Sequence, residues 1–247
     1  MRAMILAAGL GTRLRPLTNT VPKPLLRVAG TPLIEWNLLL LRRYGIIDVV
    51  INLHHLGALI EEHLGDGTRF GMRLSYSHEA VIIGTGGGIK RVESFFGGEP
   101  FLVLNGDTLL ELDLDILVRF HCERQALATM VVRADPDPDQ WGAVDMDDDQ
   151  RVVRITGRGR KGVVQAQKRM FAGVHVMHPR LLASVPPDRE SSIIDAYVRE
   201  IESGATILGF EMNGYWSDVG TPERYAQVQR DAEAGLIILA GRSGRGS

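Results

Sequence analysis

Short apolar runs alternate along the first half of the chain with longer segments whose apolar residues recur at helical spacing. The run at 3–8 is typical of a buried strand, and the segment at 32–44 places Ile34, Leu38 and Leu41 on one helix face. Short apolar strands separated by helices are typical of βαβ units, which form parallel sheets with helices on both faces. We therefore predict a Rossmann-like α/β fold with a mixed, mostly parallel sheet.

The same pattern predicts the remaining elements. Further strands are expected at 48–53, 73–77, 101–105 and 127–133, and further helices at 56–64, 86–96 and 112–123. After residue 134 a turn-rich acidic segment precedes more closely spaced strands, as in an antiparallel or mixed region, at 143–146, 152–155 and 170–177. A polar loop is expected at 163–169, then helices at 193–203 and 222–234 with a strand at 205–212 between them.

The chain length suits one large α/β domain or two small ones. We predict a single domain over 1–236, followed by a low-complexity, disordered tail at 237–247.

Charge and composition exclude several classes of protein. Lys and Arg total 28 and Asp and Glu total 30, so the net charge is −2 and there is no basic excess for nucleic acid. No apolar run approaches the ~20 residues that a membrane-spanning helix needs, and the start of the chain lacks a signal-peptide pattern. The single cysteine, Cys122, cannot form an internal disulfide and fits a reducing compartment. We expect a cytoplasmic protein without membrane or nucleic-acid partners.

A glycine-rich, basic loop follows the first predicted strand. It carries Gly9, Gly11, Thr12, Arg13, Arg15 and, a few residues on, the proline-bracketed Lys23. Glycines let backbone N–H groups approach a ligand, and successive N–H groups in a turn bind anions. Arginine adds a forked phosphate donor and lysine a point charge. An ordinary strand-to-helix turn would explain the glycines but not the cations, so the loop indicates a polyphosphate site.

Two other nucleotide-binding motifs are absent. The Gly-x-Gly-x-x-Gly fingerprint fails because its third position is Leu14, and a P-loop fails because the sequence has no Gly-Lys pair.

Residues 6–25 resemble the signature of the sugar-1-phosphate nucleotidyltransferases, Leu-Ala-Ala-Gly-x-Gly-Thr-Arg-Leu-x-Pro-Leu-Thr followed by Pro-Lys-Pro-Leu. The resemblance implies the nucleotide-diphospho-sugar transferase fold, in which this loop wraps a nucleoside triphosphate. It makes Arg13 and Lys23 the expected catalytic residues, with Arg13 on the β- and γ-phosphates and Lys23 neutralising charge around the reacting phosphates. The nucleotide-binding residues expected in the loop are Leu6, Ala8, Gly9, Gly11, Thr12 and Arg13.

Two aspartates stand in short motifs far apart in the chain. Asp107 directly follows the predicted strand at 101–105, and Asp218 precedes Thr221-Pro222, a typical helix start. By themselves these aspartates could be turn or cap residues. The resemblance makes both of them metal ligands, and two carboxylates combined with phosphate oxygens suit Mg²⁺.

Three consecutive glycines, at 86–88, begin the helix expected at 86–96. The resemblance places Gly86 and Gly87 against the base or ribose, while a simple helix start is the alternative. For Glu79, just upstream, we expect a solvated surface side chain, with support of the glycine-rich loop as the alternative.

The second half of the chain carries weaker signals. The resemblance places Asn105, Gly142 and Gly173 at the substrate, and divides the domain into a nucleotide-binding part at about 1–134 and a sugar-binding part at 135–236. The family's Glu-Lys-Pro, which binds the sugar and its phosphate, is missing here. Its place is taken by a basic stretch that either substitutes for the lysine or is a solvated loop, with the candidates Arg158, Arg160, Lys161 and Lys168.

The reaction that the resemblance implies joins a sugar 1-phosphate to a nucleoside triphosphate. GTP with mannose or heptose 1-phosphate is the favoured pair, and UTP with N-acetylmuramate 1-phosphate or another hexose 1-phosphate is the alternative. A silent relative that binds nucleotide sugar and regulates a partner is the alternative of another class, although it would not need Arg13, Lys23, Asp107 and Asp218 together. The sequence leaves a homodimer open.

Overall fold

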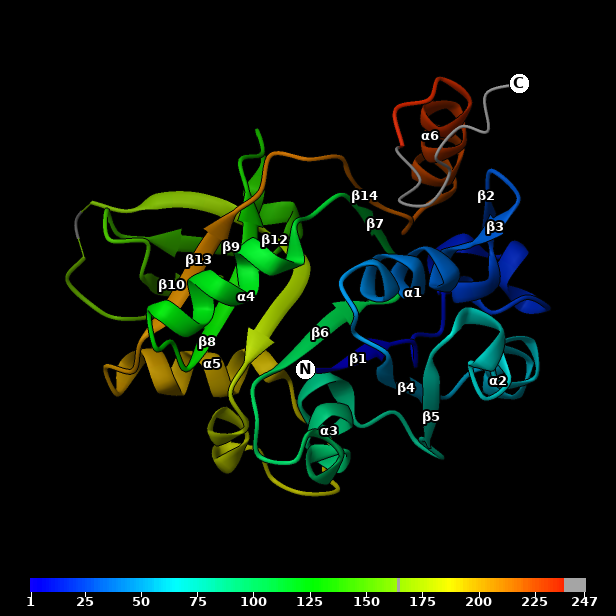
Figure 1. Ribbon diagram of the computed structural model, residues 1–247. Helices are drawn as coiled ribbons and strands as arrows, with labels where there is room; N and C mark the ends of the chain where they lie inside the picture. The colour runs from blue at the N-terminus through cyan, green and yellow to red at the C-terminus, as the bar shows by residue number, and fades with distance from the viewer. Residues whose placement is uncertain (164, 238–247) are drawn as a thin grey trace. The chain divides into compact units, whose positions relative to one another are not determined.

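The structure, a computed structural model, describes residues 1–163 and 165–237 (Figure 1). The chain folds into two compact units that interleave along the sequence. The N-terminal unit contains Arg2–Val81, Leu104–Leu112 and residues 214–237, and the central unit contains Ile82–Val103 and Asp113–Asn213. The division into binding parts at 1–134 and 135–236 stays a prediction, because compactness does not report what each part binds.

Three parallel strands form the sheet of the N-terminal unit. β1 (Arg2–Leu6) pairs with β4 (Asp48–Leu53), which pairs with β5 (Arg73–His78). β1 and β4 carry the buried apolar side chains of this sheet, Met4 and Ile5 among them, whereas the apolar side chains of β5 are only partly buried. The connections carry α1 (Leu33–Arg43) and α2 (Gly57–Leu64), so this unit contains the predicted βαβ pattern (Figure 1).

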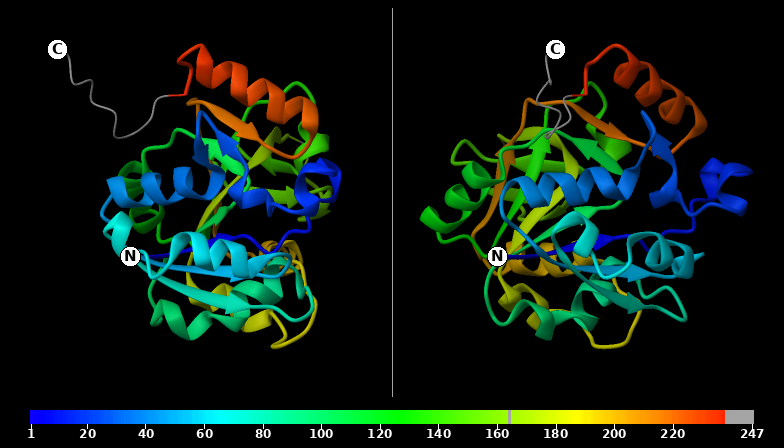
Figure 2. Two further views of the ribbon diagram at one scale, coloured as in Figure 1. Left: turned by 90° about the vertical axis from the view of Figure 1, so that its right-hand side faces the viewer. Right: turned by 45° about the vertical axis from the view of Figure 1, so that its right-hand side comes forward.

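Short paired segments complete the N-terminal unit. β2 (Arg27–Val28) and β3 (Thr31–Pro32) form a hairpin, and β7 (Thr108–Leu110) pairs antiparallel with β14 (Trp216–Asp218). Helix α6 (Pro222–Glu233) contacts β14 and β2, and Figure 2 shows it beside the hairpin. Short 3-10 helices lie between these elements, at Thr12–Leu14, Leu17–Asn19, Lys23–Leu25 and Thr68–Phe70.

One apolar cluster joins these short segments. Its buried members are Leu14, Leu26, Val28, Leu33, Leu109, Val219 and Val228. Leu14 follows Arg13 in the chain, Leu109 lies two residues after Asp107, and Val219 follows Asp218. Burying such side chains stabilises the fold by about 1.5–3 kcal/mol each. The same cluster therefore fixes the three segments that carry the predicted phosphate and metal residues.

The central unit is built mainly on antiparallel strands. β12 (Gln167–Met177) pairs antiparallel with β8 (Ala128–Arg133) and β9 (Ala143–Met146), and β10 (Val152–Ile155) pairs with β9 and β11 (Arg158–Gly159). β13 (Ile207–Glu211) joins β8 in parallel. The helices are α3 (Gly84–Arg91), α4 (Leu114–Glu123) and α5 (Ile193–Glu202), and 3-10 turns span Glu93–Phe96, Pro138–Trp141 and Pro179–Ser184. β6 (Phe101–Asn105) runs from this unit into the other.

Most predicted elements are confirmed, and those at 48–53, 101–105, 143–146 and 152–155 have the predicted bounds. The helix predicted at 86–96 is wrong, because α3 ends at Arg91 and a 3-10 turn follows. The loop predicted at 163–169 is wrong from Gln167 on, where backbone pairing with β9 extends β12 despite the polar side chains. The predicted tail lies outside the described residues apart from Ile237. No helix within the described residues is long and apolar enough to cross a membrane.

Candidate active site

The loop after β1 is held in place by contacts on both sides of its glycines. β1 ends at Leu6 because the Ala7 N–H donates to Asn52 Oδ1 at 2.8 Å instead of continuing the ladder. Further on, the hydroxyl of Thr18 donates to the Gly11 carbonyl at 2.7 Å, and Gly11 has a left-handed φ of +63° that favours glycine.

The predicted phosphate-binding residues lie on the outside of this loop. Gly9, Thr12 and Arg13 are exposed, while Ala8 and Gly11 are half-buried. Leu14, fully packed in the apolar cluster, fixes the backbone that carries Arg13. The loop therefore presents backbone N–H groups and a guanidinium to solvent on a rigid base, as an anion site requires.

Lys23 and Asp107 form an ion pair across the N-terminal unit. The Lys23 Nζ lies 2.5 Å from Asp107 Oδ2, and the two side chains are 10% and 31% exposed. Gly106 brings Asp107 to the end of β1: its N–H donates to the Leu6 carbonyl at 2.9 Å, and a Cβ there would lie 2.7 Å from that oxygen. The glycine of the Gly-Asp motif is thus required by close backbone packing.

Asp218 reaches the same region through β-pairing. It lies opposite Thr108 in the β7–β14 pair, and the next N–H, that of Val219, donates to the Asp107 carbonyl at 3.0 Å. The two aspartates, far apart in sequence, thus have adjacent backbones. The predicted helix start is confirmed: Thr221 caps α6 and Pro222 is its first residue.

Helix α6 is tied to the residue that precedes β14 by a half-buried phenol. Tyr215 donates its hydroxyl to Asp231 Oδ2 at 2.7 Å. Burial and the neighbouring Asp231 carboxylate raise the pKa of Tyr215 well above its usual range, so the donor proton is retained.

The donor set at Asp107 and Asp218 fits a divalent cation. Two carboxylates are the usual protein contribution to an Mg²⁺ that also binds phosphate oxygens and water. Gly220 leaves room beside Asp218, since a Cβ there would lie only 2.2 Å from Asp218 Oδ1. Within 1–163 and 165–237 no three His, Cys, Asp or Glu side chains form a metal-binding group.

The expectation of a solvated Glu79 is wrong. Its side chain is 4% exposed, and its Oε1 accepts from Asn52 Nδ2 at 2.7 Å. Asn52 in turn holds Ala7, and His54 Nδ1 lies 2.7 Å from the Glu79 carbonyl. Glu79 thus belongs to a buried polar network at the carboxyl ends of three strands. The available signal was its place directly after a strand, as for Asp107.

The glycine-rich segment has a packing role of its own. Gly86 and Gly87 lie in α3, and a Cβ would meet Ser191 Oγ at 2.9 Å in the first case and the Arg189 carbonyl at 2.6 Å in the second. The Gly86 N–H donates to the Ser191 carbonyl at 2.9 Å. Close approach of the segment before α5 explains these glycines without a ligand, and contact with the base stays a prediction.

The predicted sugar-side residues are not all in one unit. Asn105 ends β6 within the N-terminal unit, whereas Gly142 and Gly173 belong to the central unit. Of the candidates for the missing lysine, Arg158 pairs with Asp195 at 2.8 Å and Lys168 with Asp139 at 3.1 Å, all with exposed side chains. The structure therefore brings together the loop, Lys23, Asp107 and Asp218, and leaves the sugar-side assignments as predictions.

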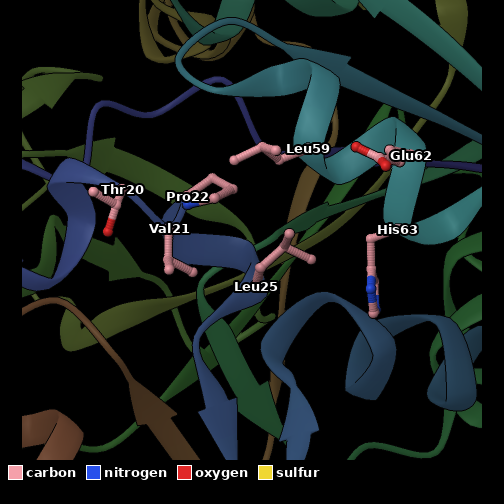
Figure 3. A pocket seen from close by; sticks show the side chains of 7 residues that line it. All are labelled: Thr20, Val21, Pro22, Leu25, Leu59, Glu62 and His63. Atoms are coloured by element: carbon pink, nitrogen blue, oxygen red, sulfur yellow. The ribbon is translucent and has the colours of Figure 1, made fainter.

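A pocket that sequence reasoning missed lies beside the segment carrying Lys23 (Figure 3). It has a volume of about 430 Å³, and Val21, Pro22 and Leu25 line it together with Leu59 and His63 of α2. None of the predicted site residues lines it. It is separate from the charged cluster around Asp107.

The chain is similar to several known proteins, and the similarity covers different shares of their lengths. An N-acetylmuramate α-1-phosphate uridylyltransferase of Neisseria meningitidis is 36% identical over 95% of this chain and 99% of its own. A UTP–glucose-1-phosphate uridylyltransferase of Synechocystis is 34% identical over 93% of this chain, and a mannose-1-phosphate guanylyltransferase of Mycobacterium tuberculosis is 32% identical over 95%. The chain spans only 63% and 65% of the lengths of these last two relatives.

The fold is shared with solved structures. A UDP-glucose pyrophosphorylase of Acinetobacter superposes with a TM-score of 0.80 at 22% identity, covering 97% of this chain and 95% of the other. This likeness confirms the predicted α/β fold class. The family model for nucleotidyl transferases matches residues 2–235, from the start of β1 to just beyond the end of α6. By this match the chain belongs to the nucleotidyl transferase family.

Proposed function

We propose that the chain joins a sugar 1-phosphate to a nucleoside triphosphate, giving a nucleotide sugar and pyrophosphate. The observation that carries the proposal is the gathering of Arg13, Lys23, Asp107 and Asp218 around the ends of β1 and β14 in one unit. The names of the three relatives, all of which act on a sugar 1-phosphate, support it.

The proposed reaction depends on positive charge around the phosphates and on alignment of the two substrates more than on acid–base chemistry. An oxygen of the sugar phosphate forms a bond to the α-phosphorus, and the bond from that phosphorus to the bridging oxygen breaks, so pyrophosphate leaves with the electron pair. The attacking oxygen is already anionic, so no general base is needed. Such transfers depend mainly on in-line positioning and on electrostatic stabilisation of the phosphoryl oxygens.

The residues of the N-terminal unit supply these requirements. The exposed Arg13 is free to bind two oxygens of the departing pyrophosphate with its forked guanidinium. Lys23, held beside Asp107, places a positive charge on a rigid backbone between two prolines. The exposed loop around Gly9 and Thr12 contributes backbone N–H donors.

Asp107 and Asp218 would hold Mg²⁺, and the ion would neutralise part of the phosphate charge while it is bound. The carboxylates fit this role because both side chains are partly accessible.

The proposal also includes which nucleotide base and which sugar the chain uses. GTP stays the prediction from the glycine-rich segment, and a guanylyltransferase is among the relatives. A uridylyltransferase is the second candidate, because the relative that matches from end to end bears that name.

A substrate matrix tests the proposal. The purified chain is mixed with each of four triphosphates, Mg²⁺ and a panel of sugar 1-phosphates, and pyrophosphate and nucleotide sugar are measured. We expect one pair to dominate, with both products formed in equal amounts. A chain that binds a nucleotide sugar but forms neither product from any pair would be the regulatory relative instead. Light scattering on the same sample decides between a monomer and the homodimer.

A further inference from the structure

Arg224 lies in the first turn of α6 and points back to Asp218. Its Nη1 donates to Asp218 Oδ1 at 2.9 Å, and the two side chains are 31% and 18% exposed. The Arg224 backbone is fixed as well, because its N–H donates to the capping Thr221 Oγ1 at 3.3 Å. The guanidinium is therefore held on Asp218 by the same turn that starts the helix.

A second observation places Arg224 beside the predicted phosphate-binding arginine. A Cβ at Gly220 would lie 3.3 Å from Arg224 Nη1, 3.1 Å from Arg13 Nη2 and 2.2 Å from Asp218 Oδ1. Two guanidinium groups and one carboxylate therefore converge on a residue that has no side chain. Paired guanidiniums are the usual protein partners of phosphate oxygens.

Two positively charged groups, the Arg224 guanidinium and a metal ion, would bind the same carboxylate oxygen of Asp218. A metal ion on Asp218 Oδ1 and the Arg224 guanidinium on that oxygen would be like charges in close contact, which is unfavourable in a partly buried site. A metal ion that binds Oδ1 would therefore displace the guanidinium from that oxygen. The displaced guanidinium lies near Arg13, where an incoming triphosphate supplies new acceptors.

We propose that Arg224 is a positioning residue that competes with the metal ion for Asp218 and binds the nucleotide's phosphates once displaced. The inference rests on the proposed function, since it takes Asp218 as a metal ligand. It predicts that a metal ion alone binds weakly, because its binding breaks the bond between Arg224 and Asp218 Oδ1. Metal and nucleotide should bind together, because the phosphates then accept that arginine.

The test compares R224Q, which removes the charge, with R224K, which keeps it. The control is R230Q, which removes a charge from the same helix at an exposed arginine bonded to Gln227. Mn²⁺ binding to the nucleotide-free chain is followed by electron paramagnetic resonance, and nucleotide binding in saturating Mn²⁺ by calorimetry. Thermal unfolding of each variant checks that it folds.

The expected effects of R224Q have opposite signs. Loss of the competing ion pair should tighten Mn²⁺ binding about tenfold, as for one charge-assisted hydrogen bond. Loss of a phosphate donor should weaken nucleotide binding about fivefold or more. R224K should stay near the wild type for Mn²⁺, and R230Q should change neither affinity. If R224Q leaves Mn²⁺ binding unchanged or weakens it, Arg224 only supports α6 and the proposal is wrong.

The two proposals fail separately. Absence of pyrophosphate from every substrate pair would contradict the proposed function, whatever Arg224 does to Mn²⁺ binding. Normal turnover by the wild type with no response of Mn²⁺ affinity to R224Q would contradict only the inference about Arg224.

Discussion

Gly9 allows the nucleotide-binding loop to be tested apart from the stability of the fold. An added Cβ at Gly9 would have no heavy atom within 4 Å, and the residue does not have a positive φ. Gly9→Ala should therefore fold normally and gain about 0.4–1 kcal/mol of stability from reduced freedom of the unfolded chain. The methyl group would stand where the loop is expected to approach the triphosphate.

The functional cost of the same change can be bounded. Forcing a methyl group into a packed contact typically costs about 1–3 kcal/mol, which corresponds to roughly 5- to 150-fold in affinity. The assay is calorimetry with a non-hydrolysable nucleotide and Mg²⁺, together with thermal unfolding. Gly11→Ala is the contrast, because its φ of +63° and the Thr18 methyl 3.0 Å from the new Cβ should lower stability. Unchanged nucleotide affinity in a stable Gly9→Ala variant would refute the placement of the nucleotide on this loop.

Three further predictions concern charge, the polar network and pH. Arg13→Ala and Asp107→Ala should each lower turnover by about a hundredfold or more, because each removes one preorganised charged group. A pyrophosphate-release assay measures the turnover. A near-normal rate in either variant would exclude that residue from the mechanism. Asn52→Ala strips buried partners from Glu79 and Ala7 and should cost about 1–3 kcal/mol in a urea unfolding curve, whereas an unchanged midpoint would show that the network adds nothing. Burial lowers the pKa of His175 to about 3, whereas an exposed histidine in the unfolded chain has its ordinary pKa of 6.5. Below pH 6.5 the unfolded chain therefore binds a proton at this position and the folded chain does not. The free energy of unfolding should for this reason fall by about 2 kcal/mol between pH 7 and pH 5. Unfolding curves at pH 7 and pH 5 should show that His175→Gln loses less stability than the wild type over that range. An equal loss in both proteins would contradict the lowered pKa of His175.

The elements that the sequence predicted correctly are those whose residues show a clear pattern within the element itself. The strand at 48–53 is mostly apolar, and the helix at 222–234 has both a threonine cap and a proline at its first position. The predicted family is confirmed by the match over residues 2–235. The site roles of Arg13, Lys23, Asp107 and Asp218 stay predictions, although the structure brings all four into one unit.

What the sequence missed depends on contacts between distant segments. β7 and β14 are three residues long each and exist because they pair with each other across more than a hundred positions, which no local pattern reveals. Burial of Glu79 depends on Asn52, a neighbour only in the folded sheet. The pairing of Arg224 with Asp218 depends on the turn into α6, and a surface role was equally consistent with the sequence.

The most direct test of the site is a structure of the chain soaked with Mn²⁺ and a non-hydrolysable form of the triphosphate that the substrate matrix selects. Anomalous scattering locates the ion independently of the refined coordinates. The account predicts an ion within about 2.0–2.3 Å of oxygens from both Asp107 and Asp218, with Arg13 on the terminal phosphates. An ion bound elsewhere, or a triphosphate that does not contact the loop from Gly9 to Arg13, would contradict it.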